Sequence, residues 1–147
     1  MRWLVRAGLR DEADVRDRIY MTAMTTCFPG RRPDGAGDRR PSSAEVLLCA
    51  PWLDAVIALL APRLIIPIGS LSLERFLPGR KLDEVIGWAY TAGGSALPGT
   101  PRAVPALLPL PHPSGQSRWL NDPARVALLD RALLRLAALI EWADSAP

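Results

Sequence analysis

Apolar side chains recur with helical spacing in two long segments of the chain. Ser42-Ser43-Ala44-Glu45 has the spacing of a capping box, so a helix is expected to begin there and to continue with apolar positions every three or four residues. Pro51 lies inside this segment and either kinks the helix or opens a second one. Near the C-terminus, Asp122 and Pro123 provide an N-cap and a first-turn proline for a closing helix that ends near Trp142. The two apolar stripes consist of Val46, Leu47, Ala50, Leu53, Ile57 and Leu60, and of Val126, Leu129, Leu133, Leu136 and Ile140.

Short, continuous apolar runs predict strands between the helices. Residues 64–68 end at Gly69 and are typical of a buried parallel strand. Residues 104–110 form a second run, although its prolines disfavour a regular ladder. Residues 18–22 are rich in β-branched and aromatic side chains, so we expect a strand to start there. Short helices are expected over residues 3–7, 11–18 and 70–77, loops over 29–41 and 112–121, and irregular structure over 78–101.

In this prediction, helices and strands alternate along the whole chain. Such alternation favours an α/β fold, and we expect residues 1–147 to form one three-layer α/β/α domain with a parallel sheet. Ligands of such sheets bind beyond the carboxyl ends of the strands. Three segments fall at those ends, residues 23–30, 69–72 and 111–119, and the last contains the single histidine of the chain, His112.

Composition and charge narrow the class of protein only a little. The 147 residues carry a formal net charge of +3, and Lys81 is the one lysine among 18 Lys and Arg residues. Arginine suits bidentate phosphate contacts, although a GC-rich genome would produce the same bias. The N-terminus lacks the pattern of a signal peptide and two cysteines make no disulfide framework, so a cytoplasmic protein is expected, with no identifiable protein partner. No membrane span is expected either, because the most apolar stretch, residues 46–73, is interrupted by Pro51, Asp54, Pro62 and Arg63.

Residues 111–121 hold the most informative group of side chains. His112 stands between Pro111 and Pro113, which stiffen its backbone and could aim its imidazole accurately. The residues that follow offer hydroxyls, a glycine, an arginine and an indole, a combination that suits a phosphate and a stacked base. Local chemistry also allows a proline-rich turn whose histidine simply caps a backbone group. The loop continues after Pro113 with Ser114, Gly115, Gln116, Ser117, Arg118 and Trp119.

Other candidates for chemistry are fewer. Taken alone, Cys27 and Cys49 are most simply buried small hydrophobic residues. Together with His112 they would be acceptable zinc ligands by type. Residues 69–73 do not match the G-x-S-x-G turn of a serine hydrolase, so the sequence does not favour nucleophilic serine chemistry.

Two blocks of the sequence resemble the uracil-DNA glycosylase superfamily. Residues 112–114 (HPS) resemble its second signature motif, the histidine loop that follows the last strand. Upstream, residues 20–30 (YMTAMTTCFPG), 37–41 (GDRRP) and 49–53 (CAPWL), together with Glu45, resemble the iron–sulfur branch, family 4 and its relatives. Residues 64–69 (LIIPIG) resemble the strand and glycine that come next. The resemblance runs from about residue 3 to residue 142, with both blocks in the order of the family.

The resemblance implies a DNA-repair enzyme of base excision, which flips a deaminated base out of DNA and cleaves its N-glycosidic bond. In that chemistry His112 would stabilise the departing uracil anion by a hydrogen bond to a pyrimidine oxygen. Cys27 and Cys49 match two of the four thiolate ligands of a [4Fe–4S] cluster, which this chain cannot complete alone. The implied DNA contacts are Ser114 and Gly115 to a backbone phosphate, and Gln116, Ser117, Arg118 and Trp119 as a wedge beside the flipped base.

The sequence departs from the family pattern in three ways. No counterpart of the first cysteine pair, the water-positioning motif and the base-stacking aromatic precedes residue 3. Ala23 occupies the place of the uracil-reading asparagine and cannot hydrogen-bond a pyrimidine. The first strand of the family, in the interior of the sheet, is also expected to be absent. We therefore expect a partial, N-terminally truncated domain that is poorly stable and inactive as it stands. The alternative is a non-catalytic nucleic-acid-binding or iron–sulfur protein of the same fold.

Overall fold

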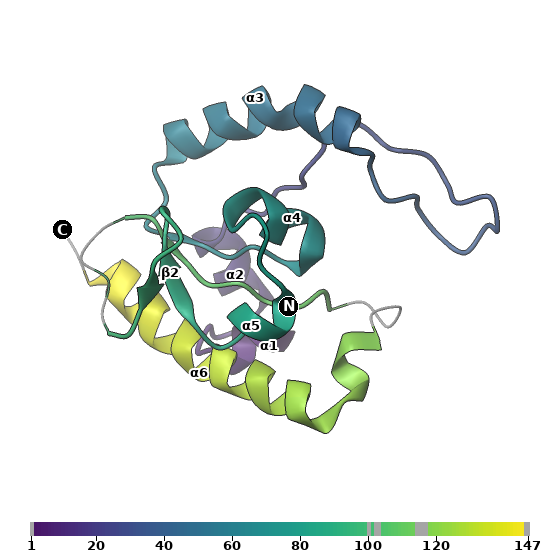
Figure 1. The fold of residues 1–147 in the computed structure, drawn as a ribbon. Helices are drawn as coiled ribbons and strands as arrows, with labels where there is room; N and C mark the ends of the chain where they lie inside the picture. The colour runs from purple at the N-terminus through teal and green to yellow at the C-terminus, as the bar shows by residue number, and fades with distance from the viewer. Residues whose placement is uncertain (1, 100, 102–103, 114–117, 146–147) are drawn as a thin grey trace. The chain divides into compact units, whose positions relative to one another are not determined.

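The computed structural model describes residues 2–99, 101, 104–113 and 118–145, with only the backbone of Arg118. The chain forms two compact units, whose ribbons are drawn in Figure 1. The sheet unit is made of residues 1–20 and 62–147, and the cysteine unit is made of residues 21–61. The expectation of one domain over residues 1–147 stays a prediction.

The sheet unit contains a four-stranded sheet in the order β1-β4-β2-β3. β1 and β4 run parallel, with Leu64 opposite Ala106, whereas β2 is antiparallel to both of its neighbours. The predicted α/β class with parallel strand pairing is therefore confirmed, and the sheet is mixed because a hairpin joins it. The strands are β1 (Leu64–Ile65), β2 (Ala89–Thr91), β3 (Ala96–Leu97) and β4 (Ala106–Leu107).

The prediction of irregular structure over residues 78–101 is wrong. This segment contains the short helix α5 (Leu82–Val85) and the β2–β3 hairpin. The turn is closed by a hydrogen bond from the Thr91 N–H to the Ser95 carbonyl (2.8 Å), and Gly94 adopts the left-handed φ of +82° that the turn needs. Strands of two or three residues are too short for an alternating apolar pattern to stand out in a sequence.

The predicted strand at residues 18–22 is also wrong. Helix α2 (Glu12–Arg18) extends to Arg18, and Ile19 follows as its extended C-cap, with φ −120° and ψ 117°. Tyr20 is 63% exposed, and in the described part of the chain no strand includes it. A preference for the extended backbone becomes a strand only where a partner supplies the ladder of hydrogen bonds, and here none does.

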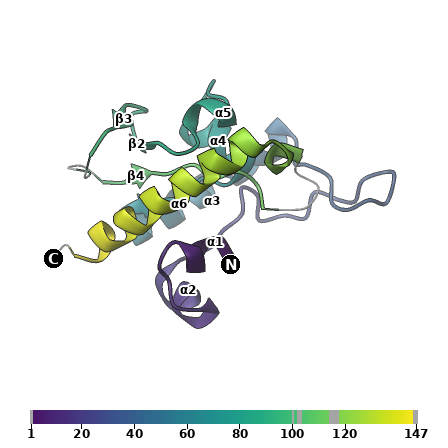
Figure 2. The same ribbon diagram turned by 90° about the horizontal axis from the view of Figure 1, so that it is seen from below.

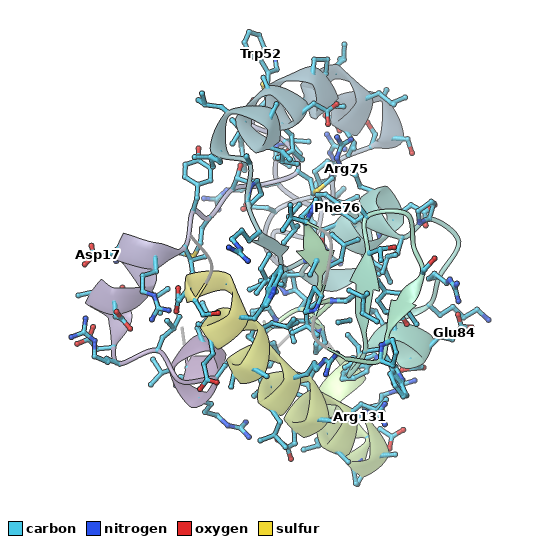
Figure 3. All side chains as sticks on the ribbon, turned by 90° about the vertical axis from the view of Figure 1, so that its left-hand side faces the viewer. Asp17, Trp52, Arg75, Phe76, Glu84 and Arg131 are labelled. Atoms are coloured by element: carbon cyan, nitrogen blue, oxygen red, sulfur yellow. The ribbon has the colours of Figure 1, made fainter. Side chains whose placement is uncertain are left out.

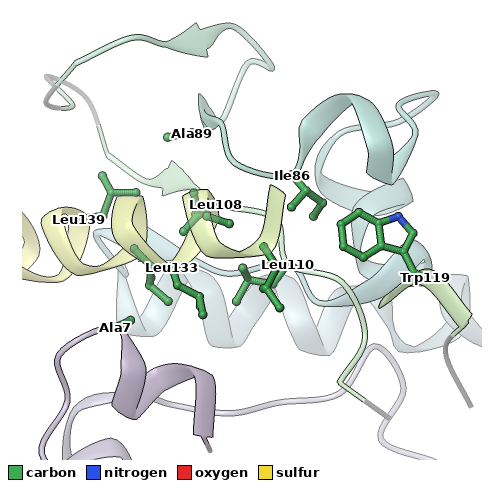
Figure 4. Close-up of a cluster of buried hydrophobic side chains, with 11 residues drawn as sticks. Ala7, Ile86, Ala89, Leu108, Leu110, Trp119, Leu133 and Leu139 are labelled. Carbon is green, nitrogen blue, oxygen red and sulfur yellow. The ribbon is translucent and has the colours of Figure 1, made fainter. Parts of the chain in front are cut away.

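Helix α6 (Pro123–Asp144) carries the largest part of the core. It begins as predicted, with the Asp122 side chain accepting the N–H of Ala124 and Pro123 in the first turn. Its buried leucines pack against Leu108 and Leu110, and Ala7, which follows helix α1 (Arg2–Arg6), belongs to the same cluster (Figure 4). Figure 2 shows α6 between the N-terminal helices and the strands. The buried residues of α6 are Leu129, Ala132, Leu133, Leu136 and Leu139.

Helices cover both faces of the sheet. Leu108 belongs to the cluster beneath α6, whereas its neighbour Leu107 packs with Leu73 and Leu77 of the segment that begins with helix α4 (Gly69–Phe76). Successive side chains of an extended chain point to opposite faces, so this alternation assigns α6 to one face and α4 with α5 to the other. The arrangement is the layering expected from the sequence.

The cysteine unit is built around helix α3 (Ser43–Leu60). The predicted capping box is present, because the Ser42 side chain accepts the Glu45 N–H and the Glu45 carboxylate accepts the Ser42 N–H (2.7 Å). The helix continues through Pro51 and ends where Ala61 adopts a left-handed φ of 42°. The choice left open by Pro51 is therefore resolved as a single continuous helix.

Most apolar side chains of α3 are exposed. Trp52 is 69% exposed and stands out from the helix in Figure 3, whereas Cys49 and Leu53 are the two buried residues of α3. By length and composition alone, α3 is long and apolar enough to cross a membrane. A single helix of this kind is weak evidence, because core helices of soluble proteins can be as long and as apolar. Of the four expected interruptions, Pro51 and Asp54 lie within α3, whereas Pro62 and Arg63 follow it. The expectation of no membrane span stays a prediction.

Candidate functional site

The carboxyl ends of β1 and β4 bring together two of the three segments expected at a ligand site. Beyond the strands, Ile68 and Leu110 form a further parallel bridge. The Leu110 N–H donates to the Pro67 carbonyl (2.9 Å), and the Gly69 N–H donates to the Leu110 carbonyl (2.8 Å). Helix α4 starts at Gly69, and His112 lies two residues after Leu110. The third segment, residues 23–30, belongs to the cysteine unit.

His112 lies directly against Gly69. A side-chain carbon built on Gly69 would meet Cβ of His112 at 3.3 Å and Cδ2 at 3.4 Å. The preceding residue, Pro111, is buried, whereas His112 is exposed. The prolines and the parallel strand pair therefore hold an exposed histidine beyond the carboxyl ends of β1 and β4.

The first turn of α4 is closed by a side chain. The hydroxyl of Ser72 donates to the Ile68 carbonyl (2.6 Å) and also lies 3.2 Å from the Gly69 carbonyl. This bond ties the turn to the end of the β1 segment, so Gly69 is restrained on the side of the strand and on the side of the helix.

Trp119 has a different place from the one expected. Its side chain is 9% exposed and belongs to the core cluster, beside Ile86 in Figure 4. Its indole N–H donates to Asp83 Oδ1 (2.6 Å), and the guanidinium of Arg125 lies 5.7 Å from its ring centroid while donating to Asp83 Oδ2 (3.0 Å). The sequence predicted an exposed stacking or wedging face. The structure corrects this, because the indole anchors the end of the histidine loop to α5 and α6.

The remaining predicted DNA contacts lie at the edge of what the structure describes. Ser114, Gly115, Gln116 and Ser117 are outside the described residues. Arg118 begins the 3₁₀ helix Arg118–Asn121. Their assignment to phosphate and wedge contacts stays a prediction.

The cysteine unit brings Cys27 and Cys49 together. Cys27 is exposed and Cys49 is buried in α3, where its sulfur lies 3.7 Å from the hydroxyl of Thr26. Hydrogen bonds from the backbone of Thr26, and then from its side chain, lower the pKa of the Cys49 thiol. Burial opposes the shift, and smaller contributions from the backbone and side chain of Cys27 add to it. This polar surrounding favours a thiolate and is unlike that of an inert buried cysteine.

Arg39, Glu45 and the Pro29 carbonyl form a hydrogen-bonded group, called the clasp below, in the segment between the two cysteines. The guanidinium of Arg39 donates to the Pro29 carbonyl (2.9 Å) and to the Glu45 carboxylate (2.6 Å). These bonds from Arg39, followed by those from Ser42, lower the pKa of Glu45 to about 2. The clasp connects the segment just after Cys27 to the first turn of α3, one turn before Cys49.

Sequence reasoning missed several residues that position this site. Asp83 and Arg125 had no assigned role, Gly69 was noted only as the glycine that ends a strand, and Arg39 was noted only as part of a motif. The spacing of Glu45 from Ser42 was a usable local signal, but nothing in the sequence links Asp83 to Trp119, 36 residues later.

Ala23 and the described metal-ligand candidates offer little further chemistry. Ala23 is exposed in the cysteine unit, and its methyl group has neither donor nor acceptor. Among the described residues, no group of three or more His, Cys, Asp or Glu side chains is placed to hold a metal ion.

Comparison with known proteins gives this arrangement a context. No curated protein sequence matches the chain. The profile of the uracil DNA glycosylase superfamily matches residues 1–137, which include the cysteine unit, the parallel strand pair and the histidine loop. With nearly its whole length matched, the chain belongs to the uracil DNA glycosylase superfamily.

Proposed function

We propose that this chain takes part in base-excision repair as a DNA glycosylase-like protein directed at uracil or a related deaminated base. The observation that carries the proposal is the placement of His112, exposed, against Gly69 and beyond the carboxyl ends of the parallel strands. That position suits a group that must meet a base rotated out of the DNA helix.

In the proposed chemistry, His112 makes one interaction, a hydrogen bond to the departing base. As the N-glycosidic bond breaks, negative charge develops on the pyrimidine oxygens, and a fixed donor at that point lowers the barrier. An imidazole held between Pro111 and Pro113 loses little freedom when it makes this hydrogen bond. Ser114 and Gly115 would hold the adjacent phosphate, and Gln116, Ser117 and Arg118 would enter the gap in the base stack. Trp119 supports this loop from the core.

A second candidate function rests on Ala23. An alanine at the place of the base-reading asparagine supplies no hydrogen bond to uracil, so the chain would bind DNA without releasing a base. The resemblance also implies that the water-positioning motif is not among these residues, and we therefore expect base release by residues 1–147 alone to be weak or absent.

A [4Fe–4S] cluster is the cofactor implied for the branch to which we assign the chain. The surroundings of Cys49 suit a thiolate ligand, and Cys27 contributes to the lowered pKa of its thiol. Such a cluster takes four thiolates, however, and the sequence holds two cysteines, so these residues do not fit a complete site. No step of the proposed chemistry depends on the cluster. Anaerobic reconstitution should leave the purified chain with little bound iron and sulfide, and stoichiometric incorporation would contradict this reading.

The function is tested by base release from a uracil-containing oligonucleotide. The assay compares residues 1–147 with a form extended at the N-terminus by a segment that carries the water-positioning motif, and each with its His112→Ala variant. We expect release by the extended form and a loss of about a hundredfold in the variant, the usual effect of removing one donor from an oxyanion site. Release from neither form, with retained binding to DNA that carries an abasic site, would favour the second candidate function. Absence of both release and binding would contradict both.

A further inference from the structure

We infer that Gly69 is a positioning residue for His112, and that the absence of a side chain at this position sets the place of the imidazole. This role deepens the proposed function and rests on it, because it concerns the histidine to which base release is assigned. Gly69 does not itself touch the substrate in this proposal.

The first observation is the space beside Gly69. A Cβ at this residue would lie 3.3 Å from Cβ and 3.4 Å from Cδ2 of His112. The nearer atom belongs to the base of the side chain, so a rotation about χ1 cannot move it away. Any side chain at residue 69 must therefore displace His112 or move its backbone by a few tenths of an ångström.

The second observation is that the backbone around His112 cannot easily shift. The Gly69 N–H donates to the Leu110 carbonyl (2.8 Å), so the same residue that touches the histidine also holds the chain two residues before it. Leu110 and His112 each precede a proline, and Pro111 has a fixed φ. Gly69 therefore restrains His112 in two ways, by its position beside the side chain and by its hydrogen bond to Leu110.

The third observation comes from the other glycines. Gly69 has a φ of +77°, a left-handed conformation that a side chain disfavours. Gly79 has nearly the same φ, +73°, but a Cβ there would have no heavy atom within 4 Å. Backbone strain is thus common to both positions, whereas the contact with His112 occurs at Gly69.

This difference supplies a matched pair of variants. Gly69→Ala and Gly79→Ala both place a methyl group on a left-handed backbone, and only the first meets the histidine. If Gly69→Ala does not fold, Gly69→Asn and Gly79→Asn form a second pair, because asparagine tolerates the left-handed region better.

The experiment uses the fact that His112 is the one histidine of the sequence. With histidine labelled isotopically, the imidazole signals in an NMR spectrum belong to His112 without further assignment. We expect Gly69→Ala to shift these signals and Gly79→Ala to leave them close to those of the unaltered protein. Unchanged imidazole signals in folded Gly69→Ala or Gly69→Asn would overturn the inference.

A kinetic measurement distinguishes this inference from the proposed function. In the form of the protein that releases uracil, Gly69→Ala should lower kcat about tenfold with a smaller change in KM, because it misplaces the reacting group rather than the DNA. An unchanged kcat would overturn the positioning role. If the imidazole signals shift but no form of the protein releases a base, the contact is upheld and the proposed function is the part that fails.

Discussion

In the sheet unit, α6 buries five side chains against the sheet, whereas α3 in the cysteine unit buries only Cys49 and Leu53. The histidine region is thus held mainly by apolar packing and backbone hydrogen bonds. The cysteine region is held mainly by polar contacts, those of the Arg39 clasp and of Thr26 with Cys49. Apolar burial is insensitive to pH, while ion pairs and thiol hydrogen bonds depend on it. The two regions should therefore fail under different conditions.

The largest effect is expected from the core of the sheet unit. Leu136 is fully buried in α6, so Leu136→Ala should lower the free energy of unfolding by about 3 kcal/mol through lost burial and a cavity. Leu134→Ala, in the same helix at a position 77% exposed, should change it by less than about 0.5 kcal/mol. Denaturant titration measures both. Similar losses in the two variants would contradict the assignment of the core.

A smaller effect is expected at the anchor of the histidine loop. Asp83→Ala removes the acceptor of the Trp119 indole N–H and the partner of Arg125. Because Asp83 is about half exposed, we expect a loss of only about 1 kcal/mol in unfolding free energy. The control is Asp83→Asn, whose amide oxygen can still accept the indole hydrogen. The indole N–H signal of Trp119 in an NMR spectrum should shift in the alanine variant and much less in the asparagine variant. An identical response in both would argue against the anchor.

In the cysteine unit, the clasp should respond to acid. The pKa of Glu45 is lowered from 4.5 to about 2, first by the hydrogen bond from Arg39. Since the folded value lies below the ordinary one, the stabilisation by this carboxylate is present above about pH 4.5 and is lost as the pH falls through about 2. The carboxyl ¹³C signal of Glu45 should therefore titrate near the lower value. In Arg39→Ala it should move back toward 4.5, and a signal that titrates near 4.5 in the unaltered protein would contradict the clasp.

The smallest effect is expected at Cys49. Thr26→Val removes a hydroxyl hydrogen bond from the thiol but leaves the backbone contribution, which is the larger one. The pKa of Cys49 should rise slightly, so alkylation near neutral pH should slow by less than about tenfold. The measurement needs Cys27→Ser as background, because Cys27 is exposed and would react as well. The control is Thr26→Ser, which keeps the hydroxyl. An equal slowing in both variants would show that the hydroxyl does not lower the pKa of Cys49.

Local signals were enough for the long helices. The capping box at Ser42 and Glu45 and the N-cap at Asp122 mark where α3 and α6 begin, because the interacting atoms are three residues apart or fewer. The apolar run that ends at Gly69 and the histidine between two prolines were also visible, whereas the pairing of β1 with β4 was expected only in the general form of a parallel sheet. These features pointed to the strand ends where Gly69 and His112 meet.

Contacts between distant residues had no such signal. The β2–β3 hairpin is too short to show a pattern, and the extended residues around Tyr20 find no partner strand in the described structure. Trp119 was predicted to present an exposed stacking or wedging face, and its bond to Asp83 and the burial of its ring place it in the core instead.

The sequence by itself determined the helices with local caps, the α/β class and the candidate residues, because short-range hydrogen bonds and apolar periodicity are written in consecutive positions. The tertiary structure decided which of these residues meet. The restraint of His112 by Gly69, the approach of Cys27 to Cys49 and the burial of Trp119 all join positions at least 20 residues apart, and such contacts depend on the packing of the whole unit.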